Sequence, residues 1–420
     1  MSVQVAKIKG IPIRLHFTLI IAFFLISWTL AATLMPQTYH HPGLTTVHYW
    51  IMGVLGAAIL FISVLLHELA HSILALRYDI RVRQIMLFIF GGVSDMEEEE
   101  EKEWEQEGER IGPSKTDFRK EFKIAVVGPL TSFIIASVLA LAWWILVQTD
   151  ITAGGGSMVT TATINIVKKI AEGVLQYGAV VNTLLGGFNL IPAFPLDGGR
   201  ILRSALLRWK KDYDQSTKIA VKIGISISYG FMALGFITMI SGEFVSGIWI
   251  LFIGWFLNSG AQSYLGQQET SSILSKIHLQ DIMNTQIISV KEDMTINSLI
   301  KDYFNTYAKD SFPIVNELNY YLIGMITFKD AWNVSEDKRD IVKARDIMIP
   351  VTNLIVMQQN RTANEALIQM TRKGMGKVFV SNEEGKKLIG LVSKTDLINA
   401  IRERKDYMKG ISKFARKQKQ

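Results

Sequence analysis

Two histidines and a glutamate share one turn of a predicted apolar helix. The stretch FISVLLHELAHSILALRY, residues 61 to 78, places His67 and His71 four residues apart, with Glu68 directly after the first histidine. At this spacing both imidazoles lie on one face of a helix. The pattern HExxH is typical of sites in which two histidines bind zinc and the glutamate acts as a general base. Because three fixed positions also arise by chance, the string alone is a weak indication.

The surroundings of this turn strengthen the indication. A polar or ionised group inside a membrane span costs about 2.5 kcal/mol or more unless it has a partner or a function. Three such groups on one turn therefore need an explanation. A metal centre is one; hydrogen bonding between helices and a pathway for cations are the alternatives.

A catalytic zinc site needs a third protein ligand, and the chain has no cysteine to supply it. The third ligand must then be His, Asp or Glu. The best candidate is Asp197 in FNLIPAFPLDGGR, residues 188 to 200, where prolines and glycines prevent a regular helix. Irregular backbone at membrane depth is tolerated only where protein buries it or a watered cavity receives it. We therefore expect this segment to line a site inside the membrane.

The elements that position these residues are predicted membrane helices. With 49% hydrophobic and 20% charged residues, the chain of 420 residues is too apolar for an ordinary soluble protein. We predict six spans within residues 1 to 265, the first of them retained rather than removed as a signal peptide. The first lies within residues 1 to 35, and the others run roughly from 50 to 76, 122 to 147, 174 to 194, 219 to 241 and 246 to 264.

Basic residues collect in alternate loops between these spans. They precede the first span, separate the second from the third and follow the fourth, whereas the opposite loops hold almost none. Because cytoplasmic loops collect Lys and Arg, this pattern predicts a multi-pass protein of the cell membrane with both termini in the cytoplasm. The formal net charge of +7 then reflects membrane topology, and we expect no nucleic-acid partner.

The sequence changes character after about residue 266. Residues 266 to 277 read as a polar linker, and a soluble α/β pattern with an internal repeat follows. LQDIMNTQIISVKEDMTINSLI matches ARDIMIPVTNLIVMQQNRTANEAL, and FPIVNELNYYLIGMITFKD matches VFVSNEEGKKLIGLVSKTD. The repeat defines two domains, 278 to 335 and 343 to 405. A basic tail, 406 to 420, then either rests on anionic lipid or is solvated.

The two motifs of the first part together resemble the site-2 protease family of intramembrane zinc proteases. HELAH is followed by NLIPAFPLDGG, and the family pattern is matched by Asn189, Pro192, Pro195, Asp197 and Gly198. The resemblance implies that His67, His71 and Asp197 bind one Zn²⁺ and that Glu68 activates water. It implies a catalytic role for Asn189 in orienting the substrate or the oxyanion; a contact between helices is the alternative. The implied substrate is a membrane protein with a single span in the lipid bilayer.

Two further segments fit this resemblance. FIFGGV, residues 88 to 93, looks like the family's glycine-bearing loop, which either pairs with an extended substrate or serves as a packing element. VVGPL, residues 126 to 130, resembles the Gly-Pro of the next span; Thr131 and Ser132 follow it, and we assign them no role. The acidic run of residues 95 to 110 is typical of a solvated loop, the alternative being a gate or a dock for basic substrate tails.

The repeated part resembles a tandem pair of CBS domains. In that family a hydroxyl and a carboxylate of the closing motif face a bound adenine nucleotide such as ATP, ADP or AMP. The matching residues are Thr327 and Asp330 in the first domain and Ser393 and Asp396 in the second. The alternative is that each aspartate caps the following helix. The resemblance also implies a homodimer formed through the CBS domains.

We therefore predict a multi-domain protein, in which a polytopic α-helical membrane domain of six transmembrane helices precedes a soluble α/β CBS pair. The predicted activity is that of a zinc-dependent endopeptidase acting in or near the transmembrane helix of its substrates, with the CBS pair as a nucleotide sensor or gate. A CBS-regulated transporter or channel is the alternative. A transporter is expected to show repeats among its spans, and none is evident between the two halves.

Overall fold

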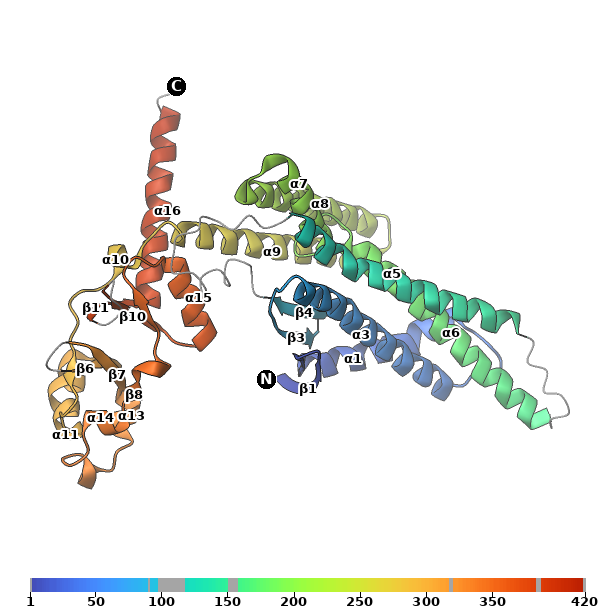
Figure 1. Cartoon of the computed structure of the whole chain (residues 1–420). Helices are drawn as coiled ribbons and strands as arrows, with labels where there is room; N and C mark the ends of the chain where they lie inside the picture. The colour runs from blue at the N-terminus through green and yellow to red at the C-terminus, as the bar shows by residue number, and fades with distance from the viewer. Residues whose placement is uncertain are drawn as a thin grey trace. The chain divides into compact units, whose positions relative to one another are not determined.

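The computed structural model describes residues 2–89, 91–96, 118–149, 158–316, 320–382 and 387–417, and for 158–162 and 408–417 it describes the backbone only. The chain divides into two compact units, residues 1–265 and 266–420. Figure 1 shows the first unit as a set of long helices beside one small sheet, and the second as strands and mostly short helices with one long helix, α16 (Lys394–Lys417). Each unit has its own cores of buried apolar side chains.

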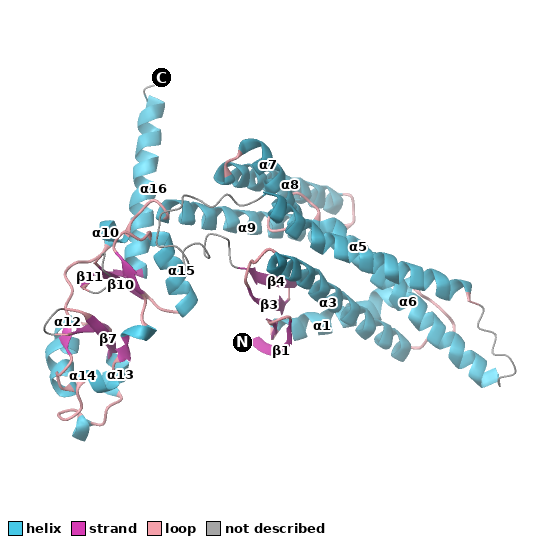
Figure 2. Cartoon of the chain, viewed as in Figure 1, coloured by secondary structure: helices cyan, strands magenta, loops and turns pink. Residues whose placement is uncertain are grey.

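Long helices make up most of the first unit (Figure 2). Their length follows from runs of apolar residues that are rarely interrupted by proline or charge. The last of them begins in the first unit and ends in the second. The helices are α1 (Thr18–Thr29), the π-helical η1 (Leu30–Leu34), α2 (Met35–Thr38), α3 (Thr46–Arg77), α5 (Phe118–Gln148), α6 (Met158–Asn189), α7 (Asp197–Lys210), α8 (Tyr213–Ile240) and α9 (Phe244–Leu274).

Five helices of the described part are long and apolar enough to cross a membrane, so the six predicted spans are not confirmed. These five are the continuous stretch Thr18–Thr38 together with α3, α5, α8 and α9. The expected fourth span lies in α6, which carries Lys168, Lys169 and Glu172 in its first half and buries Asn182 in its second. The Lys169 Nζ–Glu172 Oε2 distance is 2.6 Å, and Asn182 donates to a carbonyl of its own helix. Because of these polar groups, no stretch of α6 is both long enough and apolar enough to count as a candidate membrane span.

A small sheet covers the end of α3 that carries the histidines. It has the order β1-β2-β3-β4, and β2 and β3 are parallel although both neighbouring pairs are antiparallel. Ile11 and Ile85 are buried where the sheet packs on Ala75 of α3 and Ile124 of α5. In the strand order of this sheet, β4 lies at one edge. The strands are β1 (Ser2–Ile8), β2 (Ile11–His16), β3 (Val82–Phe88) and β4 (Gly91–Met96).

The second unit contains two sheets of similar design. The first has the order β5-β6-β7-β8 and the second the order β11-β10-β9. In the first, β6 pairs parallel with β5 and antiparallel with β7, and β7 also pairs antiparallel with β8. In the second, β10 pairs parallel with β9 and antiparallel with β11. The polar segment that we expected to be a linker is helical as far as Leu274. The elements are α10 (Leu279–Ile282), β5 (Val290–Lys291), α11 (Ile296–Ser298), η2 (Leu299–Phe304), α12 (Asn305–Tyr307), β6 (Ser311–Val315), β7 (Leu322–Thr327), α13 (Phe328–Trp332), η3 (Glu336–Lys338), α14 (Ala344–Ile347), β8 (Ile349–Pro350), η4 (Val351–Asn353), β9 (Val356–Gln358), α15 (Ala363–Lys373), β10 (Lys377–Ser381), β11 (Leu388–Ser393) and α16 (Lys394–Lys417).

The two repeats of this unit exchange their leading segments. Leu274 at the end of α9 and Leu279 at the start of the first repeat are fully buried in the core of the second. Ala344, at the start of the second repeat, is buried in the core of the first. Lys377 of the second repeat also forms an ion pair with Asp310 of the first. Because neither core is complete without the other repeat, we expect the pair to fold as one unit.

Candidate metal centre

One turn of α3 presents two buried imidazoles to the interior of the first unit. His67 and His71 are 4% and 3% exposed, and their ring centroids lie 4.9 Å apart in an edge-to-face arrangement. A 32-residue helix provides this position because its apolar sequence continues on both sides of the turn. The spacing of four residues thus brings both rings to one face, as expected from the sequence.

The third predicted ligand reaches the same point from the start of α7. The two prolines of the segment 190–196 follow α6, which ends at Asn189, and α7 begins at Asp197. Its neighbour must be glycine, because a Cβ on Gly198 would lie 2.2 Å from the Ile191 carbonyl oxygen. The tight turn directs the Asp197 carboxylate at α3: Oδ2 lies 3.0 Å from His67 Nε2 and 3.1 Å from His71 Nε2.

These three ligand atoms form a nearly equilateral triangle. The two Nε2 atoms are 3.2 Å apart, close to their distances from the carboxylate oxygen. Bonds of 2.0–2.1 Å to a tetrahedral zinc ion would set ligand atoms about 3.3 Å apart. Among the described residues, His67, His71 and Asp197 are the group of His, Asp and Glu side chains whose ligand atoms converge in this way. The donor set and its spacing fit zinc.

Two groups on α5 form hydrogen bonds with the other nitrogen of each imidazole. His67 Nδ1 lies 2.9 Å from Ser132 Oγ, and His71 Nδ1 lies 2.6 Å from the Ile124 carbonyl oxygen. A carbonyl can only accept, so His71 donates through Nδ1 and its Nε2 is left with a lone pair for a metal. Sequence reasoning assigned no role to Ser132. The available signal was its spacing of four residues from Gly128, which puts both on one face of α5.

Gly128 keeps the space beside the ligand atoms open. A Cβ at this position would lie 2.1 Å from His71 Nε2 and 2.7 Å from His67 Nε2. Any larger residue would therefore fill the place where the ligand atoms converge. The close approach of the α5 backbone to the histidines thus explains the glycine of the Gly-Pro pair at 128–129.

Glu68 lies between the histidines and the edge strand β4. A Cβ on Gly92 would lie 2.5 Å from Glu68 Cγ, so the strand passes directly over this side chain. Ser94 of β4 and Ser72 of α3 place their hydroxyl oxygens 2.6 Å apart, and Ser72 also donates to the Glu68 carbonyl. The carboxylate interacts electrostatically with both histidines and with Asp197. The structure therefore brings the HExxH glutamate and the glycine-bearing loop together.

The structure describes Asn189 but only the beginning of the acidic run. The Asn189 side chain is half-buried at the end of α6, and its amide donates to the Leu185 carbonyl oxygen at 2.9 Å. This contact lies within its own helix. Most of the acidic run at 95–110 falls outside the described residues, which end at Met96 and resume at Phe118.

The candidate nucleotide residues of the second unit pair with each other. Thr327 Oγ1 donates to Asp330 Oδ2 at 2.6 Å and accepts from the Asp330 backbone N–H. Ser393 and Asp396 form the same arrangement at the start of α16, with their side-chain oxygens 2.7 Å apart. Each hydroxyl thus caps a helix in this structure. Both aspartates retain an oxygen that could accept from a ligand.

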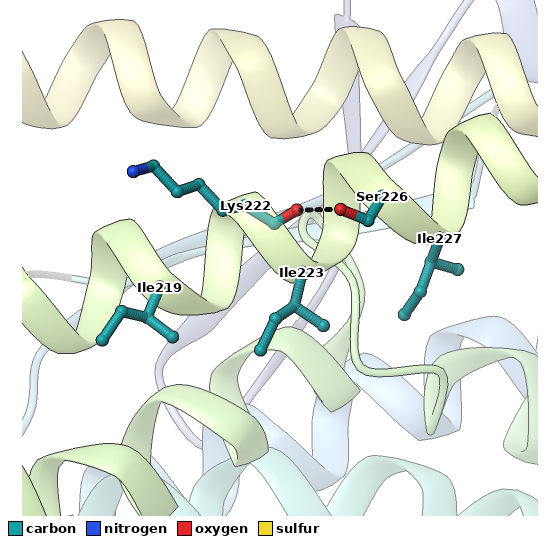
Figure 3. Close-up of a pocket in the computed structure, with 5 residues that line it drawn as sticks. All are labelled: Ile219, Lys222, Ile223, Ser226 and Ile227. Carbon is teal, nitrogen blue, oxygen red and sulfur yellow. Dashed lines mark hydrogen bonds between the residues drawn. The ribbon is translucent and has the colours of Figure 1, made fainter.

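A separate groove of about 420 Å³ runs along one face of α8 (Figure 3). Ile219, Ile223 and Ile227 line it at helical spacing, and Ser226 donates to the Lys222 carbonyl of the same helix. The groove contains no carboxylate or imidazole, so its lining offers contact to apolar groups rather than chemistry.

A membrane-embedded helical domain with a buried His-His-Asp centre next to a glutamate defines an intramembrane metalloprotease. Comparison with known proteins supports this class of protein. Residues 55–231 match Peptidase family M50, and residues 279–331 and 344–403 each match the CBS domain.

Relatives cover nearly the whole chain. Zinc metalloprotease MJ0392 of Methanocaldococcus jannaschii is 31% identical over 400 residues, which are 95% of this chain and 96% of that protein. Rip3 of Mycobacterium tuberculosis, named as a candidate zinc metalloprotease, is 28% identical over 401 residues, or 95% and 93% of the two chains. A solved structure of a site-2 protease from Methanocaldococcus jannaschii is 32% identical, covers 63% of this chain and 95% of that one, and has a TM-score of 0.39.

The chain belongs to peptidase family M50, the site-2 proteases, and carries a CBS pair at its C-terminal side. It is therefore a multi-pass membrane metalloprotease, for which the family implies zinc and a membrane-protein substrate.

Proposed function

We propose that His67, His71 and Asp197 hold the catalytic zinc and that Glu68 is the general base for hydrolysis of peptide bonds in or near a substrate's membrane span. The convergence of three ligand atoms within 3.2 Å of one another carries this proposal. Zinc, when bound, polarises the substrate carbonyl and lowers the pKa of a coordinated water to about 7. The protein's part is to bind the ion, orient its ligands and move protons.

Each ligand is held before the ion arrives. Ser132 and the Ile124 carbonyl fix the two imidazole rings through their Nδ1 atoms, which leaves Nε2 free to coordinate. Asp197 adds one negative charge, so the site keeps a net positive charge once Zn²⁺ is bound.

Glu68 is placed to move protons at this centre. As a carboxylate it takes a proton from the attacking water and later gives it to the amine that leaves. A helical substrate hides its peptide bonds in its own hydrogen bonds and must unwind locally before cleavage. Within the described part of the chain β4, directly above Glu68, is an edge strand, so its outer backbone groups can pair with an extended segment.

Asn189 completes the proposed catalytic set. Its amide is able to donate to the substrate backbone or to the developing oxyanion, provided that it releases the Leu185 carbonyl. Loss of one such donor is expected to lower kcat about 10²–10³-fold. An Asn189→Ala enzyme with unchanged kcat would remove this role.

Metal removal tests the proposed function. Detergent-purified protein is incubated with a strong zinc chelator, freed of it and assayed on a single-span substrate before and after zinc is added back. We expect cleavage to disappear with the metal and to return with zinc. Cleavage that persists after complete zinc removal would contradict the proposal. A metal-dependent ion flux in vesicles without any cleavage would favour the transporter instead.

We also propose that both termini lie in the cytoplasm. The basic residues of the alternate loops support this orientation. Because the chain has no cysteine, single cysteines placed in 36–49 and in 111–117 can be labelled without background. We expect an impermeant thiol reagent to label only the first in intact cells. The opposite labelling pattern would contradict this orientation.

The CBS pair is proposed as an adenine-nucleotide sensor or gate and as the site of homodimerisation. The free oxygen of Asp330 and of Asp396 suits ribose hydroxyls, and the neighbouring Thr327 and Ser393 suit a phosphate oxygen. Calorimetry of residues 266–420 with ATP, ADP and AMP tests the sensor, and its sedimentation tests the dimer. We expect binding that is lost in the double variant Asp330→Ala/Asp396→Ala. No heat with any of the three nucleotides would exclude the sensor.

A further inference from the structure

A buried arginine joins the helix that carries Asp197 to three neighbouring helices. Arg203 of α7 is 5% exposed, and its Nε donates to Glu121 Oε1 of α5 at 2.7 Å. A second guanidinium nitrogen donates to the same oxygen, and the third donates to the Tyr264 hydroxyl of α9. The guanidinium carbon also lies 4.7 Å from the ring centre of Tyr213 at the start of α8.

A stacked aromatic pair lies beside this guanidinium. Phe194 and Tyr264 stack with ring centroids 4.3 Å apart, and the Arg203 guanidinium lies 5.4 Å from the first ring and 5.6 Å from the second. Phe194 is three residues before Asp197 in the turn that leads into α7. The contacts of Arg203 therefore hold the backbone on both sides of that aspartate.

Glu121 connects the cluster to the histidines. It precedes Ile124 by three residues, about one turn of α5, and the Ile124 carbonyl accepts from His71 Nδ1. The Glu121–Arg203 pair thus joins the part of α5 that orients His71 to the helix that presents Asp197. α5 and α7 lie against each other along this region (Figure 1).

Stability alone does not explain the pair. Glu121 is 5% exposed, and well-packed apolar residues are often as stable as a buried ion pair, because burial costs both ions their hydration. Among the described residues, Glu121 Oε2 has no hydrogen-bond partner, so part of that cost is uncompensated. What the ion pair adds over an apolar contact is a fixed direction and distance between two helices.

We propose that Arg203, with Glu121 and Tyr264, is a positioning residue that sets the distance between Asp197 and the two histidines. This inference rests on the proposed function, in which these three residues bind zinc. The cluster does not touch the ligand atoms. It acts by fixing α7 against α5 before the ion binds.

Zinc affinity of the full-length, detergent-purified chain tests the proposal. The dissociation constant is measured by competition with a chromophoric chelator for wild type, Arg203→Met and the double variant Glu121→Gln/Arg203→Met. The double variant removes both charges, so it leaves no unpaired ion in the interior. Lys210→Met is the matched control, because Lys210 is an exposed cation of the same helix.

We expect both cluster variants to bind zinc 10- to 100-fold more weakly, the range seen when a residue supporting a metal ligand is lost. Lys210→Met is expected to stay within twofold of wild type. The melting temperature of the metal-free double variant should remain near that of wild type, and saturating zinc should restore cleavage. A purely structural pair would lower the melting temperature without changing zinc affinity.

A double variant that binds zinc within twofold of wild type would overturn the proposal. If neither cluster variant folds, Tyr264→Phe decides, because it keeps the ring and removes only the hydroxyl. It is expected to weaken zinc binding several-fold, and unchanged affinity would contradict the role of the cluster. Asp197→Ala distinguishes failure of this proposal from failure of the proposed ligand set. If this variant binds zinc as tightly as wild type, the proposed ligand set itself is wrong.

Discussion

Small residues around the two histidines decide what the centre can hold. Zinc is bound only if its ligands converge and the space between them stays empty. Gly128 provides that space, and Ser132 fixes one of the rings. Both residues belong to α5, although neither is a proposed ligand.

Replacing Gly128 with alanine should abolish zinc binding. The new methyl group would lie 2.1 Å from His71 Nε2, which is far inside van der Waals contact. We expect less than a tenth of the wild-type zinc content by elemental analysis, about the loss expected for a disrupted metal site. Gly230→Ala is the control, since a Cβ there meets nothing within 4 Å. Full zinc content in Gly128→Ala would contradict the placement of the metal.

Replacing Ser132 with alanine should weaken the centre without emptying it. His67 would lose its Nδ1 partner, and such losses typically lower metal affinity or activity 10- to 100-fold. Zinc titration and cleavage assays measure the change. Ser137→Ala, which only removes a hydroxyl bonded to its own helix, should behave as wild type. Equal affinity in the two variants would show that Ser132 does not orient the ring.

The proposed ligands could be predicted from sequence because their chemical type and spacing carry the information. Two imidazoles at four-residue spacing share a helix face, and an aspartate between prolines and glycines marks a break in a span. Ser132 and Arg203 could not be found in this way. Their roles depend on which helices lie beside each other, and the sequence around each residue does not reveal which helices pack together.

At the scale of elements, the helix α6 leaves the six predicted spans unconfirmed, whereas the edge strand β4 lies at a predicted place. α6 is a long helix at the expected place, but its charged and amide side chains keep it out of the set of apolar spans. The predicted span of 174 to 194 begins after the charged residues of α6, because an apolar pattern alone does not fix where a helix begins. β4, in contrast, lies where the glycine-bearing loop was expected to act.

A larger side chain at Gly92 should slow catalysis while zinc remains bound. Valine there would press on Glu68 Cγ, which lies 2.5 Å from the position of a Cβ. General-base catalysis contributes about 10²–10⁴-fold, so displacement of Glu68 is expected to lower kcat at least tenfold. Val93→Ala is the control because Val93 is exposed on the other side of the strand. Unchanged kcat in Gly92→Val would contradict the contact between β4 and the glutamate.

The whole molecule combines a membrane protease with a CBS pair whose repeats complete each other's cores. The repeat could be predicted, because its two copies share sequence. The exchange of leading segments could not, since Leu279 and Ala344 are equally apolar whichever core they enter. The ion pair between Asp310 and Lys377 joins the same two repeats.

This ion pair makes a pH-dependent contribution to the stability of the second unit. The hydrogen bond from Lys377 holds the pKa of Asp310 below its ordinary value. The contribution is therefore present above about pH 4, the unfolded-state pKa, and is lost as the pH falls through the lower folded-state value. Exposed pairs contribute about 0.2–1 kcal/mol, so we expect Asp310→Asn to lower the melting temperature of residues 266–420 by a few degrees at most.

Melting curves at neutral pH and at successively lower pH values check this expectation. The difference between wild type and Asp310→Asn should be constant above about pH 5 and should vanish in acid. Asp337→Asn, a surface change without an ion pair to the other repeat, serves as the control. A difference that persists below the folded-state pKa would show that the charge of Asp310 is not its cause.

The most direct test of this metal centre measures zinc content and cleavage together for wild type, Glu68→Gln and Asp197→Ala. We expect one zinc per chain and cleavage in wild type. Glu68→Gln should keep the zinc and lose cleavage, and Asp197→Ala should lose or loosen the zinc. A chain without zinc, or cleavage that survives the loss of Glu68, would contradict the assignment of this centre as the protease site.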